Sequence, residues 1–263
     1  TSRMIAYDYG SGKVAPFRAF MSGGNPISDA RLNTANSEGN TFNGTGFAEI
    51  QLPYGFKFTS INNVYLNESR STGTTNPYFG QYAASNGVVN KEHDRSWSYN
   101  YQQRINWHQV YGKHDVEVML GHEYYRAYGY ALYAGKHNQF SVDNKELAGA
   151  VILDNGSSSM SEYNTESWLS RAMYNYDSRY FGSVSAMRQA SSRFSKDNWW
   201  GTFWSFGAGW NMHKESWFNV DWINELKLKA SYGENGNDGI GSYMYTKYFK
   251  ISNSNNEVSL TPS

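Results

Sequence analysis

Residues 96–108 read SWSYNYQQRINWH, and in this stretch aromatic and aliphatic side chains occupy the odd positions while polar side chains occupy the even ones. Gln103 is the one polar residue in the odd series. A period of two sustained over this length predicts a β-strand with one apolar and one polar face. The same alternation returns at residues 115–124, 200–212 and 226–233, and helical spacing is not sustained over a comparable length. The sequence therefore predicts an all-β protein.

The connections between the predicted strands alternate between short and long. Short turns are expected at Pro53-Tyr54-Gly55, Gly112-Lys113 and Asp177-Ser178, whereas long polar loops are expected at Asn67–Asp94 and about Gly129–Tyr163. Short turns on one side and long loops on the other are typical of an up-and-down outer-membrane barrel. We therefore predict an antiparallel up-and-down transmembrane β-barrel, present here as a partial barrel of about eight or nine strands.

Composition agrees with this prediction and excludes several classes of protein. The chain has 45 aromatic residues but only 32 Leu, Ile and Val residues, whereas soluble cores are mainly aliphatic. Its 23 basic and 23 acidic residues cancel, which argues against nucleic acid as the main partner. The absence of cysteine excludes disulfides and thiolate metal sites. A mean hydropathy of −0.70 excludes a bundle of transmembrane helices.

Aromatic residues gather beside the expected short turns, as in the belt that a barrel places at a membrane interface. A soluble β-sandwich with aromatic inner faces also alternates, so alternation alone does not separate the two. Loop asymmetry, strand length and the aromatic excess favour the membrane barrel. The aromatic residues concerned are Tyr54, Tyr111, Tyr174, Tyr176, Tyr180, Phe181, Trp217, Phe218 and Trp222.

Two ordered sets of motifs near the C-terminus resemble the barrel of SusC/RagA-type TonB-dependent outer-membrane transporters. The first set is Ser191-Ser192-Arg193-Phe194, Trp200-Gly201-Thr202-Phe203 and Ala208-Gly209-Trp210-Asn211. The second is Leu226-Lys227-Leu228-Lys229-Ala230-Ser231-Tyr232-Gly233 with Asn235-Gly236-Asn237. Further matches are Leu120-Gly121-His122-Glu123, Asn175–Tyr180 and, in the early region, Asn25-Pro26.

The resemblance implies an active transporter that imports large nutrients, oligosaccharides or peptides, across the outer membrane of a Gram-negative bacterium. It implies four partners: a SusD-like surface lipoprotein, the TonB complex, the transported nutrient, and the lipid and lipopolysaccharide of the outer membrane. Members of the family form a barrel of about 22 strands filled by a plug. We interpret residues 1–263 as a middle slice of that barrel, without plug or TonB-contacting segment. Residues 1–42 are expected in an extracellular loop region and residues 43–250 in barrel strands.

No catalytic, cofactor or metal site is expected, and the chain is not predicted to be an enzyme. His108, His114 and His122 lie on neighbouring predicted strands, but His122-Glu123 lacks the second histidine of a zinc-binding H-E-x-x-H helix. Glu117 and Glu123 lie roughly 20 Å apart on one strand, too far for a pair of glycosidase carboxylates. Asp115 shares their face. Asn235-Gly236-Asn237-Asp238-Gly239 lacks the alternating ligands of a calcium loop, so a plain turn is expected.

The predicted long loops carry aromatic residues of the kind that stack on sugars, although packing within the loops is the simpler interpretation. No substrate-binding residue is assigned. The residues are Asn76-Pro77-Tyr78-Phe79 and Tyr82 in the first loop, and Tyr130, Tyr133 and His137 in the second. The alternative function is a soluble carbohydrate-binding β-domain with Trp and Tyr platforms. A β-rich glycoside hydrolase is disfavoured because no carboxylate constellation is found.

Overall fold

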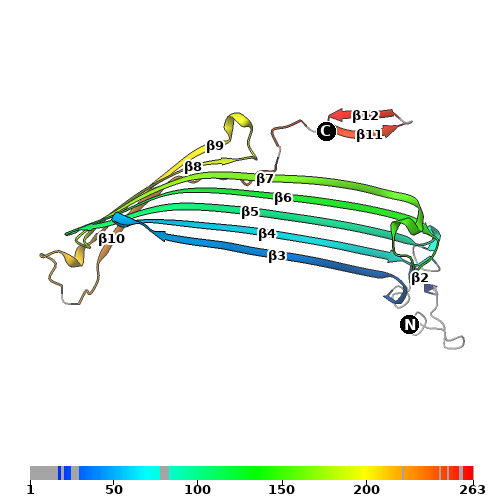
Figure 1. Ribbon diagram of the computed structural model, residues 1–263, viewed down its shortest axis with the longest axis horizontal. Coiled ribbons are helices and arrows are strands. Elements are labelled where there is room, and N and C mark those ends of the chain that lie inside the picture. Colours follow the sequence, from blue (N-terminus) through cyan, green and yellow to red (C-terminus); the bar gives the residue numbers. More distant parts are fainter. Residues whose placement is uncertain are drawn as a thin grey trace. The chain divides into compact units, whose positions relative to one another are not determined.

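The computed structural model describes residues 17–18, 21–24, 30–77, 83–220, 222–242, 244–247, 249–254 and 257–262. Within these residues the chain is almost entirely β-structure. Eight strands form one sheet, in the order β10-β9-β8-β7-β6-β5-β4-β3, so that each strand pairs with its neighbours in sequence (Figure 1). The strands are β3 (Thr34–Gln51), β4 (Phe56–Thr75), β5 (Val88–Tyr111), β6 (His114–Gln139), β7 (Ala150–Tyr176), β8 (Tyr180–Ser191), β9 (Trp200–Asn211) and β10 (Lys227–Gly233).

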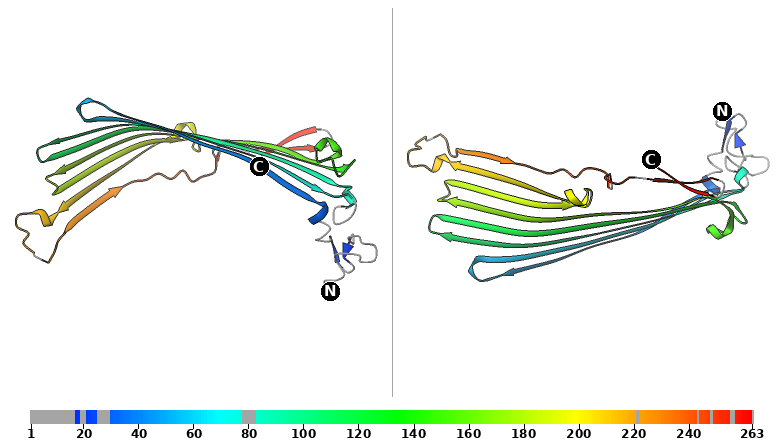
Figure 2. Two further views of the ribbon diagram at one scale, coloured as in Figure 1. Left: turned by 60° about the horizontal axis from the view of Figure 1, so that its bottom comes forward. Right: turned by 90° about the horizontal axis from the view of Figure 1, so that it is seen from above.

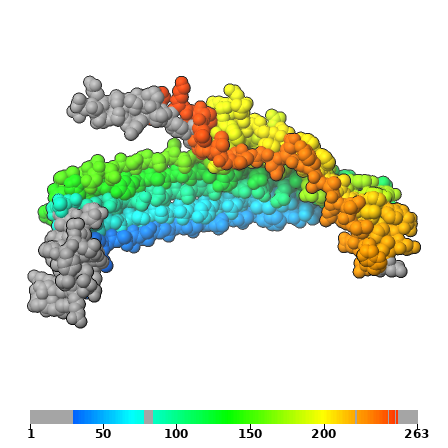
Figure 3. All heavy atoms as spheres, turned by 180° about the vertical axis from the view of Figure 1, so that it is seen from behind, coloured from blue at the N-terminus to red at the C-terminus, as the bar shows by residue number. Residues whose placement is uncertain are grey.

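The predicted antiparallel up-and-down arrangement is confirmed. β8 pairs antiparallel with β7 and β9, and β9 pairs antiparallel with β10. The same order can be followed in the two further views of Figure 2, and Figure 3 shows the sheet from behind as adjoining bands that run from blue through cyan to green. Two separate two-stranded pairs are β1 (Phe17–Arg18) with β2 (Met21–Gly24), and β11 (Phe249–Ser254) with β12 (Glu257–Pro262). Single turns of 3-10 helix are η2 (Pro53–Gly55), η3 (Ala83–Ser85), η4 (Leu147–Gly149), η5 (Lys196–Asn198) and η6 (Met212–Lys214).

The chain divides into two compact units. The first comprises Thr1–Asn43, Tyr65–Trp97 and Tyr128–Glu162, and the second comprises Gly44–Val64, Ser98–Ala127 and Tyr163–Ser263. Where the described residues of the first unit form strands, hydroxyl and amide side chains pair across them. Three such pairs connect β3 with β4, namely Thr34–Thr74 at 2.7 Å, Ser37–Ser71 at 3.0 Å and Thr41–Asn67 at 2.9 Å.

The two predicted long loops are wrong in extent, because most of their residues form strands. β4 continues to Thr75 and β5 begins at Val88, while β6 continues to Gln139 and β7 begins at Ala150. β3 begins at Thr34. Residues 67–75 at the end of β4 are polar or glycine on both faces, so they carry no alternation of hydropathy. Their backbone ladder and cross-strand hydroxyl pairs hold them in the sheet without an apolar face.

The sheet has very little core of its own. Among the described residues, Val89 and Ala150 are the only buried hydrophobic side chains. Many large hydrophobic side chains are exposed instead, including Trp168 at 54%, Phe206 at 50% and Val184 at 53%. A folded soluble domain buries such side chains against a second layer. No helix among the described residues has the length and hydropathy needed to cross a lipid bilayer.

Three tight turns in the second unit join consecutive strands where the sequence predicts them. Tyr54 and Gly55 have φ values of 61° and 83°, and Gly112 has a φ of 61°. The two-residue turn Gly112-Lys113, with a positive φ at its first residue, has the pattern of a type II′ hairpin. Asp177 and Ser178 also have positive φ values, 53° and 54°. The Arg179 amide donates to the Tyr176 carbonyl at 2.9 Å, which closes this third turn.

Candidate functional site

Alternation in the second unit gives the sheet two chemically different faces. On one face, which we call the polar face, β5 and β6 are joined by polar side chains. Gln102 donates to Glu123 at 3.0 Å, and His108 contacts Asp115 at 2.7 Å. On the opposite face the ring of His122 packs on Trp168, with 4.3 Å between ring centroids. The faces therefore follow the period of two that the sequence predicts.

The second face, which we call the apolar face, extends across β7 to β10 by strand register. Trp168 pairs with Arg188, Val184 with Phe206, and the series continues onto β10 through Phe206 and Tyr232. Trp204 and Phe206 stack on each other and both contact Tyr232. The remaining members of this face are Ile105, Trp107, Val116, Val118, Leu120, Ala172, Ala186, Ala208, Leu228 and Ala230.

An aromatic belt borders the apolar face beside the short turns. Tyr176 stacks on Tyr180, and Tyr180 stacks on Trp210, with ring centroids 6.4 and 6.3 Å apart. His114 joins them through its ring contact with Tyr176, and Trp217 packs against Trp210. These rings lie where the sequence predicts the interface belt. We call them the lower belt.

A second belt, missed by the sequence analysis, borders the apolar face toward the far ends of the strands. His122 contacts Glu166 at 3.1 Å, and the Arg188 guanidinium lies 5.2 Å from the centre of the Trp200 ring. Tyr101 and Trp168 complete this upper belt by packing on either side of His122. A signal for it was present in the sequence, since Arg188 is the one charged residue in the even-numbered series of β8.

The spacing between the belts matches a lipid bilayer. On β7, Tyr176 and Glu166 are separated by ten residues. A rise of about 3.3 Å per residue, in strands tilted by about 40° as in barrels, makes this roughly 25 Å. The apolar band of an outer-membrane barrel has a height of about 25 Å and an aromatic girdle on each side. The arrangement suits a protein whose outer surface contacts hydrocarbon.

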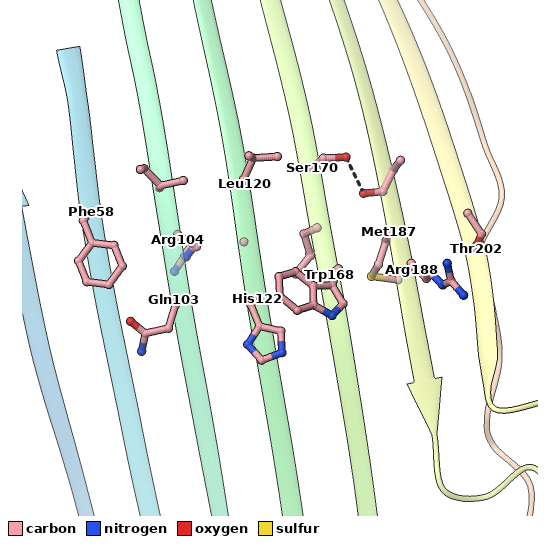
Figure 4. A pocket seen from close by; sticks show the side chains of 14 residues that line it. Phe58, Gln103, Arg104, Leu120, His122, Trp168, Ser170, Met187, Arg188 and Thr202 are labelled. Atoms are coloured by element: carbon pink, nitrogen blue, oxygen red, sulfur yellow. Dashed lines mark hydrogen bonds between the residues drawn. The ribbon is translucent and has the colours of Figure 1, made fainter. Parts of the chain in front are cut away.

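A hollow of about 550 Å³ indents the apolar face just inside the upper belt (Figure 4). Figure 4 shows His122, Trp168 and Arg188 in one row across neighbouring strands, and Leu120 and Ser170 in the next row. Small side chains create the space, because Ser170 pairs with Ala186 across β7 and β8. The hollow is therefore apolar inside and carries a cation at its rim.

The polar face has its own hollow, of about 680 Å³, which carries charges of both signs. Acidic groups come from Asp115 and Glu117 on β6, and basic groups from Arg171, Lys227 and Lys229 on β7 and β10. Together with the amides and hydroxyls of the neighbouring strands, these groups make the polar face a hydrophilic surface. Such a surface suits an aqueous lumen.

The histidines considered as metal ligands are not brought together. His108 contacts Asp115, His114 contacts the Tyr174 hydroxyl at 2.7 Å, and His122 lies on the apolar face. No group of three or more possible metal ligands occurs among the described residues. The candidate carboxylates are also separated, because Glu117 accepts from Asn106 and Glu123 from Gln102 at different levels of β5 and β6.

The Asn235–Gly239 segment forms a local turn, in which the Gly239 amide donates to Asn237 at 2.8 Å. Asp238 does not face into a ligand loop but accepts hydrogen bonds from the hydroxyls of Tyr163 and Ser191. The Tyr163 hydroxyl, followed by Ser191 and the nearby Arg193, holds the pKa of Asp238 below its usual range. This carboxylate anchors the segment after β10 to β7 and β8.

The aromatic residues expected in the second long loop lie instead within β6, in the first unit. Tyr130 packs edge-on against His93, and the Tyr133 hydroxyl donates to Asn90 at 3.1 Å. His137 is hydrogen-bonded to Asp154. Tyr133 and Asn90 also line a hollow of about 400 Å³ with Ser37 and Ser71. Asn76 and Pro77 begin the connection that follows β4, while Tyr78, Phe79 and Tyr82 lie outside the described residues, as do Asn25 and Pro26.

A polar cluster ties the short turns together. Lys113 donates to Asp177 at 2.9 Å, and Arg179 bonds both Asp177, at 2.6 Å, and Glu215, at 3.2 Å. Hydrogen bonds from Lys113 and then Arg179 lower the pKa of Asp177, and the same carboxylate raises the pKa of Arg179. Glu215 also accepts from Tyr180 and Trp210, and these donors lower its pKa. The cluster fixes the geometry below the lower belt.

Comparison with curated proteins identifies relatives of one kind. The chain is 28% identical over 242 residues to the TonB-dependent receptor SusC of Bacteroides thetaiotaomicron, covering 87% of this chain and 23% of that protein. It is 25% identical over 223 residues to the TonB-dependent receptor P3 of Formosa agariphila, covering 83% of this chain and 22% of that protein. The chain thus spans less than a quarter of the length of these relatives. No family model matches it.

Solved structures agree on the fold. The chain superposes on the RagAB peptide transporter with a TM-score of 0.85, at 23% identity, over 96% of this chain and 29% of that one. It matches the open-open state of the RagAB peptide importer with a TM-score of 0.81, at 24% identity and the same coverage. The resemblance to SusC/RagA-type TonB-dependent transporters is confirmed. The chain has the fold of part of such a transporter barrel.

Proposed function

We propose that this chain forms part of the wall of a TonB-dependent importer in the outer membrane of a Gram-negative bacterium. The observation that carries the proposal is the exposed apolar face, bordered by two belts at roughly the thickness of a bilayer core. A protein in water would leave Trp204 and Phe206 exposed at 43% and 50% against no partner layer. In lipid, the same exposure is favourable.

The polar face lines the path of the cargo in this proposal. The proposed cargo class is a large nutrient, an oligosaccharide or a peptide, as the SusC/RagA-type resemblance implies. The RagAB peptide transporter is among the solved structures that the chain resembles. A SusD-like surface lipoprotein and the TonB complex are the proposed partners. The role assigned to this chain is structural and permeation-related, not enzymatic, since the proteins that it resembles are TonB-dependent receptors and a peptide transporter.

The decisive experiment uses the intact outer-membrane protein that carries this chain. Cells that express it are fractionated and supplied with fluorescent oligosaccharides and peptides, with and without a protonophore that removes TonB-derived energy. We expect the protein in the outer-membrane fraction and an uptake that the protonophore abolishes. Recovery in the soluble fraction, with glycan binding but no uptake, would instead support the soluble carbohydrate-binding alternative.

A further inference from the structure

Arg188 is an unneutralised cation on the apolar face. It lies near the end of β8, with Trp168 of β7 and Thr202 of β9 as its register partners. Its guanidinium packs over the Trp200 ring at 5.2 Å. In the described part of the chain, no carboxylate lies within ion-pair distance of Arg188. A cation on a hydrocarbon-facing surface is costly unless an anion or the interface accommodates it.

The nearest acidic group on this face is already engaged by other donors. Glu166 accepts a hydrogen bond from the indole nitrogen of Trp168 at 3.3 Å, and His122 lies 3.1 Å away. All three lie in the upper belt beside Arg188. The guanidinium therefore keeps its donors available for a group outside the chain. Because its fork of donors is planar, its best match is a carboxylate or a phosphate.

The apolar hollow begins directly beside this cation. Arg188 lines it together with Leu120, Ile105, Trp168 and Ala186, and its volume is about 550 Å³. Leu120 is 54% exposed, so the floor of the hollow is open to whatever covers the apolar face. A site with one cation at the rim and hydrocarbon-lined space below it matches a lipid with a phosphate head and an acyl chain.

We propose that this hollow binds one phosphorylated lipid A-type molecule of the outer leaflet. Its phosphate lies on Arg188, and one acyl chain fills the space above Ser170 and Ala186. The leaflet follows from the strand ends, because the upper belt lies on the side away from the short turns, which face the periplasm in such barrels. The inference rests on the proposed membrane role, and it assigns a specific binding site to the lipopolysaccharide that the family resemblance implies as a partner.

The test measures binding of bisphosphorylated lipid A to the intact detergent-purified protein by native mass spectrometry. Arg188→Gln is expected to weaken binding about tenfold, since it removes a charge-assisted bidentate contact. Ala186→Leu keeps the cation but fills the hollow, and it is expected to weaken binding by a similar factor. Arg171→Gln is the matched control, because Arg171 is also an exposed arginine but lies on the opposite face. We expect it to leave binding unchanged.

Two further sets of measurements are needed. The first distinguishes a lipid phosphate from free phosphate, and the second distinguishes failure of the lipid site from failure of the proposed function. Inorganic phosphate at millimolar concentration is expected not to displace the lipid, and dephosphorylated lipid A is expected to bind weakly. Equal binding by wild type and Arg188→Gln, or displacement by inorganic phosphate, would overturn the lipid site. Outer-membrane insertion and uptake are measured for each variant. A protein that inserts and imports but binds lipid independently of Arg188 refutes this inference alone, whereas one that never enters the membrane refutes the proposed function.

Discussion

The ammonium group of Lys113 donates a hydrogen bond to the carboxylate of Asp177 at 2.9 Å, joining two turns that are 64 residues apart in sequence. The Asp177 backbone amide reinforces the link by donating to the Lys113 carbonyl at 2.8 Å. Arg179, two residues further along the chain, donates two hydrogen bonds to the same carboxylate, at 3.0 and 2.6 Å. The β5–β6 hairpin and the β7–β8 hairpin are thus coupled by one acidic side chain.

Asp177→Asn should reduce stability slightly at neutral pH and flatten its dependence on pH. The pKa of Asp177 is lowered in the folded protein, chiefly by Lys113. The carboxylate therefore stabilises the fold above its unfolded-state pKa, and this contribution is lost as the pH falls through the lower folded-state pKa. Asparagine tolerates the left-handed backbone at this position, so the substitution tests the charge alone.

The measurement is the denaturant midpoint of the detergent-solubilised protein at several pH values below about 5, where carboxylates titrate. Wild type should lose stability more steeply than the variant across this range. The difference at neutral pH should be small, because exposed ion pairs contribute little. Parallel pH profiles for the two proteins would show that Asp177 does not couple the turns electrostatically.

Ser178→Gly should stabilise the same turn. Ser178 has a φ of 54°, in the left-handed region that costs a side chain roughly 1–2 kcal/mol. Glycine removes this cost but adds freedom to the unfolded chain, so we expect a net gain of about 1 kcal/mol. The control is Ser183→Gly in the interior of β8, where we expect a loss of about 0.5–1 kcal/mol. Destabilisation by both substitutions would contradict the turn geometry.

Alanine substitutions at Gly55 and Gly112 distinguish the cost of a steric clash from the cost of backbone strain. Both have positive φ values, but a Cβ on Gly55 would lie 2.3 Å from the His108 carbonyl oxygen, whereas a Cβ on Gly112 meets nothing within 4 Å. Gly112→Ala should cost about 1–2 kcal/mol through backbone strain alone. Gly55→Ala should cost at least about 2 kcal/mol more, because backbone must move. Unfolding midpoints of the two variants compare these effects, and equal losses would refute the clash.

The sequence predicted those parts of the fold in which a local pattern carries the structural cause. Residues 96–108 lie within β5, and the segment 200–212 coincides with β9 to within one residue. The sequence predicts the turn at Asp177-Ser178 because one strand pattern ends before these residues and the next begins after them. The strand extension at residues 67–75 was missed, since a strand with polar side chains on both faces has no period in hydropathy.

Contacts between distant strands were beyond any local pattern. The pairing of Lys113 with Asp177 depends on the register of β6 against β7, and neither residue is unusual in its own segment. The upper belt was missed for the same reason, because Tyr101, His122, Trp168 and Trp200 come from four different strands. Arg188 is the one residue of this region that the local sequence marks as unusual, because it is the only charged residue in the even-numbered series of β8.

A pair of adjacent substitutions decides which face of the sheet contacts lipid. Val184 and Ser183 are consecutive in β8 and point to opposite faces. Val184 lies midway between Tyr180 of the lower belt and Arg188 of the upper belt, and its side chain is 53% exposed. Ser183 instead lines the charged hollow of the polar face. An arginine introduced at position 184 would therefore lie on the apolar face, whereas one at position 183 would lie on the polar face.

We expect Val184→Arg to destabilise the membrane-inserted protein by about 2–4 kcal/mol, because arginine at the bilayer midplane on the lipid face carries that cost. Ser183→Arg should cost much less, since the polar face offers water and the carboxylates of Asp115 and Glu117. The free energy of unfolding from lipid vesicles measures both variants. If Ser183→Arg destabilised the protein more than Val184→Arg, the apolar face would be the one in contact with water and the polar face the one covered by a packed layer. The membrane orientation inferred from the two belts would then be wrong.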